Sequence, residues 1–124
     1  MTTIARLAGV TLDSSDPHRL ADFYRQLLGL EVFLDDEDYV ALKGGGVLLT
    51  THRVEGHVPP SWPSGPTPKQ MHLDVAVDDI ERAESLALSL GATRASYQPS
   101  PDRWRVMIDP AGHPFCLTTL PPRD

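Results

Sequence analysis

The chain contains an internal repeat, and this repeat restricts the possible folds more than any other feature of the sequence. In the second half, the alternating stretch 71–79 predicts a strand that leads into a helix, and Gly91 ends this helix. In the first half, Asp16 and Gly29 lie 62 residues before Asp78 and Gly91. Aspartate is a preferred helix N-cap, and glycine is common just after the last helical turn. Three short strands follow each helix, so we predict an α+β fold built from two βαβββ modules.

Each predicted helix carries a single apolar stripe at helical spacing. The stripes consist of Leu20, Phe23, Tyr24, Leu27 and Leu28 in the first helix, and of Ile80, Ala83, Leu86, Ala87 and Leu90 in the second. Helices that cover one face of a sheet leave its other face open. Two such sheets that curve toward each other would enclose a trough, which is a natural ligand site. We therefore expect a curved mixed sheet around a trough, with the helices on the outer face.

A proline-rich stretch separates the two halves. Residues 55–69 contain five prolines, which are incompatible with a regular helix or strand. The chain, 1–124, is therefore predicted to be one domain with module one at about 1–54, a linker at about 55–69 and module two at about 70–120. Trp62 in the linker either anchors the linker to the body of the protein or forms part of a lid over a pocket.

Two short segments complete the predicted sheets. Glycines at 44–46 could suggest a phosphate-binding loop, but no helix and no Lys-Ser/Thr pair follows them. We interpret them as a tight turn between two strands. A further strand is predicted at 93–97, directly after the second helix.

The charge and cysteine content exclude several classes of protein. The chain has 124 residues, with 11 Lys and Arg against 17 Asp and Glu, and its net charge is −6. An acidic protein repels the phosphate backbone, so a nucleic-acid partner is not expected. No apolar run reaches the ~20 residues that span a bilayer, and the first residues lack the pattern of a signal peptide. Cys116 is the single cysteine, which excludes an internal disulfide. We therefore expect a cytoplasmic protein without a membrane partner.

Strand alternation assigns the polar residues near the start of the second module to one face. His72 and Asp74 share a face with Ala76, whereas Leu73, Val75 and Val77 share the opposite face. The face toward the helix should be entirely apolar, so His72 and Asp74 should line the trough. Asp74 could then orient His72 as a general base or bind a polar ligand. Alternatively, both residues could simply hydrogen-bond to neighbouring strands or to a partner subunit.

Several motifs resemble a known superfamily. The paired βαβββ plan, with VAVDDIERA…SLGA and DPAGHPFCL, resembles the vicinal-oxygen-chelate superfamily, which includes glyoxalase I, bleomycin-resistance proteins and extradiol dioxygenases. The stretches MHLDVAVDDIERAESLALSLGA and WRVMIDPAGHPFCL are similar to its bacterial glyoxalase-like domain group. The resemblance covers nearly the whole chain and implies a homodimer. These motifs identify a fold better than they identify a reaction.

The resemblance also implies where a metal would bind. Metal-dependent members hold one divalent ion with four side chains, from the first and last strands of each module. These places correspond to Gly9, Leu48, His72 and Cys116. Glycine and leucine cannot ligate a metal, and a thiol replaces the usual glutamate, so we expect no metal cofactor. As an alternative, a slip in the fourth strand would bring Thr50 or His52 to the trough, and His52, His72 and Cys116 could then hold a single Zn, Ni or Fe ion.

The remaining candidates have both a functional and a structural interpretation. Cys116 could be a nucleophile with His72 as its base, which requires a lowered thiol pKa, but a lone cysteine in a strand is more often a small buried apolar residue. Trp104 could be a wall of the trough or a core residue. The full set of expected pocket residues is Gly9, Leu48, Thr50, His52, Trp62, His72, Asp74, Trp104 and Cys116.

Three functions are compatible with these features. The first is a metal-independent protein that binds a small, partly apolar organic molecule, like the bleomycin-resistance proteins of the resembled superfamily. The second is a lyase or isomerase that uses His72 with a metal or with Cys116 as catalytic residues. The third is a structural or regulatory domain whose trough is filled by side chains.

Overall fold

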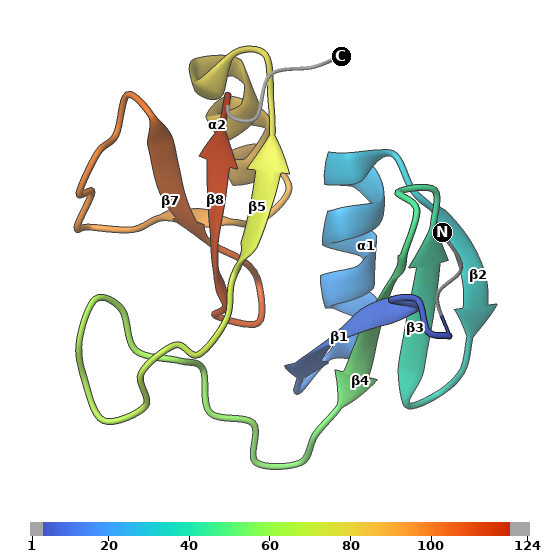
Figure 1. Ribbon diagram of the computed structural model, residues 1–124. Coiled ribbons are helices and arrows are strands. Elements are labelled where there is room, and N and C mark those ends of the chain that lie inside the picture. Colours follow the sequence, from blue (N-terminus) through green and yellow to red (C-terminus); the bar gives the residue numbers. More distant parts are fainter. Residues whose placement is uncertain (1–3, 120–124) are drawn as a thin grey trace. The chain divides into compact units, whose positions relative to one another are not determined.

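The computed structural model describes residues 4–119, which form two four-stranded mixed sheets with one helix each (Figure 1). The strand orders are β1-β4-β3-β2 and β5-β8-β7-β6. In both sheets the first and last strands of the module pair in parallel, and the other pairs are antiparallel. The predicted α+β fold with two βαβββ modules is therefore confirmed. The elements are β1 (Gly9–Ser14), α1 (Pro17–Leu28), β2 (Glu31–Asp35), β3 (Tyr39–Lys43), β4 (Leu48–Arg53), β5 (Leu73–Ala76), α2 (Ile80–Ser89), β6 (Thr93–Arg94), β7 (Trp104–Ile108) and β8 (Pro114–Thr118).

Contacts divide the chain into two compact units between His57 and Val58. The first unit forms as the sequence predicts. The Asp16 side chain accepts a hydrogen bond from the Arg19 amide, and Gly29 ends α1 with a φ of 66°. Residues 44–46 form the turn between the antiparallel strands β3 and β4. No helix among residues 4–119 is long and apolar enough to cross a membrane.

In the second unit the helix cap lies one residue later than predicted. The Asp79 carboxylate, and not that of Asp78, accepts the hydrogen bond from the Arg82 amide at 3.2 Å. Asp79 lies 63 residues after Asp16, and His72 lies 63 residues after Gly9. The two modules therefore align from the first strand to the helix cap without a gap, and α2 is shorter than α1.

The helix-facing side of the second sheet is not entirely apolar, which corrects a second prediction. Arg105 on β7 is buried beneath α2, where its guanidinium donates hydrogen bonds to Glu81 and Glu84, both at 2.9 Å. These bonds hold the pKa of Arg105 above its ordinary value. A buried guanidinium is tolerated because two carboxylates on successive turns of the helix pair with it. Leu86, expected in the buried stripe, is 45% exposed.

The strand predicted at 93–97 is also shorter than expected, because β6 ends at Arg94. The Gln98 side-chain amide takes over the sheet hydrogen bonding beyond this point. It donates to the carbonyls of Ala95 and Val106 at 2.9 and 2.7 Å, and its oxygen accepts from the Val106 amide at 2.9 Å. This clamp fixes β7 beside the segment that follows β6.

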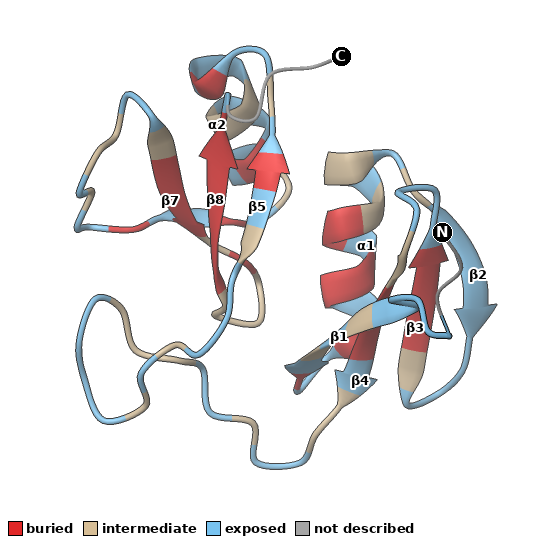
Figure 2. Ribbon diagram, in the orientation of Figure 1, coloured by how far each residue is buried: buried red, intermediate tan, exposed pale blue. Residues whose placement is uncertain are grey.

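The proline-rich stretch from Val58 onward packs on the second module. Trp62 lies against a buried cluster of Ala95, Val106 and Cys116. Figure 2 shows that the buried residues of this unit concentrate on β7, β8 and α2. Trp62 therefore anchors the stretch to the module, as one of the two interpretations of its role proposed.

Candidate functional site

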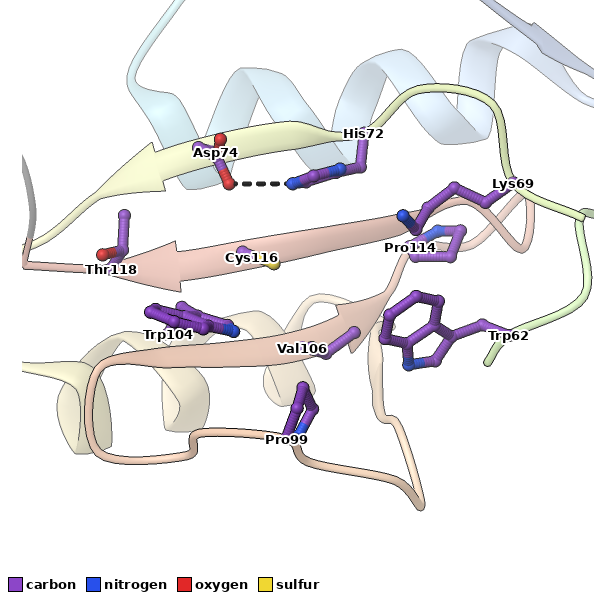
Figure 3. A pocket seen from close by; sticks show the side chains of 10 residues that line it. All are labelled: Trp62, Lys69, His72, Asp74, Pro99, Trp104, Val106, Pro114, Cys116 and Thr118. Carbon is purple, nitrogen blue, oxygen red and sulfur yellow. Dashed lines mark hydrogen bonds and ion pairs between the residues drawn. The ribbon is translucent and has the colours of Figure 1, made fainter. Parts of the chain in front are cut away.

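The second module contains a cavity of about 410 Å³ on the sheet face opposite α2 (Figure 3). Its walls come from strands β5, β7 and β8 and from the irregular segments around positions 62, 69 and 99. The lining residues are Trp62, Lys69, His72, Asp74, Pro99, Trp104, Val106, Pro114, Cys116 and Thr118. Five of the nine residues expected in a pocket thus surround one cavity.

Strand register explains why these side chains meet. Asp74 on β5 pairs with Cys116 on β8, which in turn pairs with Val106 on β7. Thr118 and Trp104 form the next pair on the same face. Paired residues on adjacent strands point to the same side of a sheet. The alternation therefore directs this row of side chains into the cavity, while Arg105 points to the helix.

One edge of the cavity is polar. His72 Nε2 lies 3.1 Å from Asp74 Oδ1, and the ligand atoms of His72, Asp74 and Cys116 all lie within 4.8 Å of one another. The side chains of His72 and Asp74 are 35% and 63% exposed, so both can reach a molecule that enters from solvent. We call these three residues the polar cluster.

Cys116 is poorly suited to act as a nucleophile. Burial raises the pKa of its thiol, the Asp74 carboxylate raises this pKa further, and the positive charge of Lys69 opposes both effects. A nucleophilic cysteine instead needs surroundings that favour the thiolate. Because the residue is 8% exposed and packs on Ala95 and Val106, its thiol forms part of the apolar floor.

The remaining walls are mostly apolar and include two indole rings. In Figure 3, Trp104 and Trp62 lie at opposite ends of the cavity, with Val106 and Pro99 along its lower side. The Lys69 ammonium lies 4.6 Å from the centroid of the Trp62 ring, where the ring attracts the cation. The buried Trp62 Nε1 has no hydrogen-bond acceptor within residues 4–119, and an unsatisfied buried donor is unfavourable.

The other four expected pocket residues belong to the first unit. Gly9 pairs with Leu48, and alternation places Thr50 and His52 on the same face of the first sheet as Leu48. A Cβ atom added to Gly9 would lie 3.0 Å from the Leu48 carbonyl oxygen, so close strand approach favours glycine here. The residues at these two places cannot supply metal ligands, and the superfamily's four-residue metal site does not fit this chain.

The sequence-based set omitted five lining residues. Val106 and Thr118 could have been found, because they alternate with Trp104 and Cys116 on predicted strands. Pro114 starts β8 at the edge of a predicted turn. Lys69 and Pro99 lie in irregular segments, where periodicity carries no information about side-chain direction.

Comparisons with known proteins agree with the fold. A family model described as a glyoxalase-like domain matches residues 9–118. No curated protein matches the sequence.

Solved structures with the same fold include several with different described functions. A glyoxalase/bleomycin resistance protein/dioxygenase family enzyme from Burkholderia phytofirmans is 20% identical, with a TM-score of 0.71 over 91% of this chain and 97% of the other. The fosfomycin resistance protein FosX from Mesorhizobium loti is 17% identical, with a TM-score of 0.70 over 94% and 93%. A lactoylglutathione lyase from Agrobacterium tumefaciens is 20% identical, with a TM-score of 0.63 over 94% and 95%. At these identities the likeness establishes the fold alone.

Proposed function

The chain belongs to the glyoxalase-like domain family, and on this premise we propose that it binds a small, partly apolar organic molecule in the cavity of its second module. The observation that carries this proposal is the cavity of about 410 Å³ that combines apolar walls with one polar edge. Small-molecule sites commonly have volumes of roughly 300–1,000 Å³ and few, well-placed polar groups. We further propose that binding requires no metal, because Gly9 and Leu48 interrupt the superfamily's ligand set.

The apolar walls would supply most of the binding free energy. Burial of apolar surface contributes roughly 25 cal/mol per Å², and flat indole rings favour a ligand that is itself flat. Trp104 and Trp62 offer such surfaces at the two ends of the cavity. The ligand would therefore carry an aromatic or otherwise planar apolar portion.

The polar edge would fix the orientation of the ligand. Asp74 is an acceptor, and Lys69 is a donor with a positive charge. His72 can donate or accept, depending on its tautomer. Because one anionic and one cationic side chain face the cavity, a ligand with both a donor and an acceptor matches this edge better than one that carries a large net charge.

A thermal-shift screen in the presence of a metal chelator tests this proposal. A ligand of the native state raises the apparent melting temperature with its concentration. Small planar compounds with mixed polar groups should raise it in the chelator, and Trp104→Ala should weaken their affinity by about tenfold or more, because an aromatic wall is lost. Phe33→Ala is the matched control, since Phe33 is an exposed aromatic residue of the first unit. Stabilisation only after a metal is restored, or equal loss in both variants, would contradict the proposal.

A lyase or isomerase is the second candidate. It is favoured by the His72–Asp74 hydrogen bond, because a carboxylate that orients an imidazole is a common arrangement for a general base. In this alternative a metal or Cys116 would assist His72. The raised thiol pKa of Cys116 opposes the metal-free version of this mechanism.

We predict that the purified protein does not convert the methylglyoxal–glutathione adduct. Stabilisation of a metal-bound ene-diolate requires an ion held firmly by several side chains, and two of the four superfamily places are Gly9 and Leu48. The measurement is product formation with nickel or zinc added, with a known glyoxalase as the positive control. Turnover that His72→Ala abolishes would replace the first proposal with the second.

A further inference from the structure

We propose that His72, Asp74 and Cys116, the polar cluster, form a three-ligand site for a thiophilic divalent cation such as Zn²⁺. This inference goes beyond the proposed function, because binding of the organic molecule does not depend on it. The site would lie wholly within the second module and would use Asp74. It differs from the superfamily's site, whose places here are Gly9, Leu48, His72 and Cys116.

The distances within the cluster are close to those of a tetrahedral site. With Zn–N and Zn–O bonds of about 2.0–2.1 Å, tetrahedral geometry separates two such ligands by about 3.3 Å. The His72 Nε2 and Asp74 Oδ1 atoms are 3.1 Å apart. The third atom, Cys116 Sγ, lies within 4.8 Å of both. Because His72 and Asp74 are partly exposed, small side-chain rotations can bring their ligand atoms toward the fixed sulfur.

The backbone holds the ligands in register. Asp74 and Cys116 are direct partners in the parallel pairing of β5 and β8. His72 lies two residues before Asp74, and Figure 3 shows that its ring extends along the strand toward Asp74, above Cys116. The site therefore rests on two paired strands of one sheet, which favours a defined geometry.

The cluster places two acidic groups together, and a cation would stabilise both. The Asp74 carboxylate disfavours a second negative charge on the Cys116 sulfur. When a divalent ion binds, the sulfur–hydrogen bond breaks, a sulfur–metal bond forms and the proton passes to solvent. A thiolate, a carboxylate and an imidazole together form a ligand set that suits Zn²⁺ better than Mg²⁺ or Ca²⁺. Lys69 opposes cation binding through its positive charge, so its removal should strengthen the site.

Cobalt(II) titration of the chelator-treated full chain tests this inference. Cys116 is the only cysteine, so a near-ultraviolet thiolate-to-cobalt band can arise from this residue alone. We expect a saturable band at one ion per chain that Zn²⁺ removes by competition. Cys116→Ser should abolish the band, and Asp74→Asn should weaken cobalt affinity by at least about tenfold, since even outer-shell partners contribute tenfold or more. Lys69→Gln should increase the affinity.

Asp102→Asn is the matched control, because Asp102 is an exposed carboxylate of the same module outside the cluster. A second measurement uses the native sequence: saturating Zn²⁺ should slow the reaction of the Cys116 thiol with a disulfide reagent by at least about tenfold, in proportion to occupancy of its ligand site. No band with the unaltered chain, equal affinity of Asp74→Asn and Asp102→Asn, or a thiol rate insensitive to Zn²⁺ would each overturn the inference. Failure here leaves ligand binding in chelator intact, so the two proposals are separable.

Discussion

Cys116 shows how one residue's surroundings decide its chemistry. From the sequence, the thiol could be a nucleophile or a small buried apolar residue, and no spacing rule separates these roles. The structure places it on the cavity floor beside Asp74, and both burial and this carboxylate raise its pKa. The neutral thiol is therefore the dominant form near neutral pH.

The two charged neighbours of Cys116 should shift its ionisation in opposite directions. Because Asp74 raises the thiol pKa, Asp74→Asn should move the midpoint of the alkylation-rate profile to lower pH. Because Lys69 lowers this pKa, Lys69→Gln should move the midpoint to higher pH. The measurement is the pH dependence of iodoacetamide alkylation in chelator, with Asp102→Asn as the control. Shifts of the same sign in both variants would contradict this electrostatic account.

At the same scale, His72 and Asp74 were assigned to the open sheet face correctly, because period-two alternation needs only the sequence. Lys69 could not be assigned in this way. It lies in a segment without periodicity, and its position over the Trp62 ring depends on how the proline-rich stretch packs. Residues outside regular elements acquire their direction from tertiary contacts.

At the scale of elements, the repeat predicted both helices and the strand order of both modules. Its error at the second helix cap came from two adjacent aspartates, since either Asp78 or Asp79 can cap a helix. The equal spacing of Gly29 and Gly91 favoured the earlier one. The structure places the difference inside α2, which has 10 residues where α1 has 12.

The pairing of α2 with β7 was not predictable from hydrophobic pattern. Arg105 lies at a helix-facing position that alternation assigns to an apolar side chain, and its two partners look like ordinary surface glutamates. In the same sheet, a glutamine side chain replaces backbone pairing beyond β6. Both arrangements depend on long polar side chains that reach across elements.

Removal of either glutamate should reveal how unequal the two ion pairs of Arg105 are. The Glu84 side chain is 12% exposed, whereas that of Glu81 is 75% exposed. Glu84→Gln should lower the free energy of unfolding by about 1–3 kcal/mol, because it weakens a buried charged hydrogen bond. Glu81→Gln should cost less than about 1 kcal/mol, because solvent screens this pair. Urea unfolding monitored by circular dichroism measures both. A larger loss for Glu81→Gln would contradict the assignment.

At the scale of the whole molecule, the family followed from the sequence, but the location of the cavity did not. The cavity is formed by the second unit alone, because the proline-rich stretch brings Trp62 onto the open face of its sheet. The expected homodimer stays a prediction, which light scattering of the purified chain would check by a mass of about two chains.

The central claim is that the cavity of the second module binds a small organic molecule. Both tryptophans of the chain, Trp62 and Trp104, line this cavity. Intrinsic fluorescence therefore observes the proposed site and no other tryptophan environment.

The most direct measurement is a fluorescence titration, in chelator, with the compounds that stabilise the protein most. The account predicts saturable changes in the emission of both single-tryptophan variants, Trp62→Phe and Trp104→Phe, with midpoints that agree with the thermal shifts. Stabilising compounds that leave the emission of both tryptophans unchanged would bind elsewhere and would contradict the account.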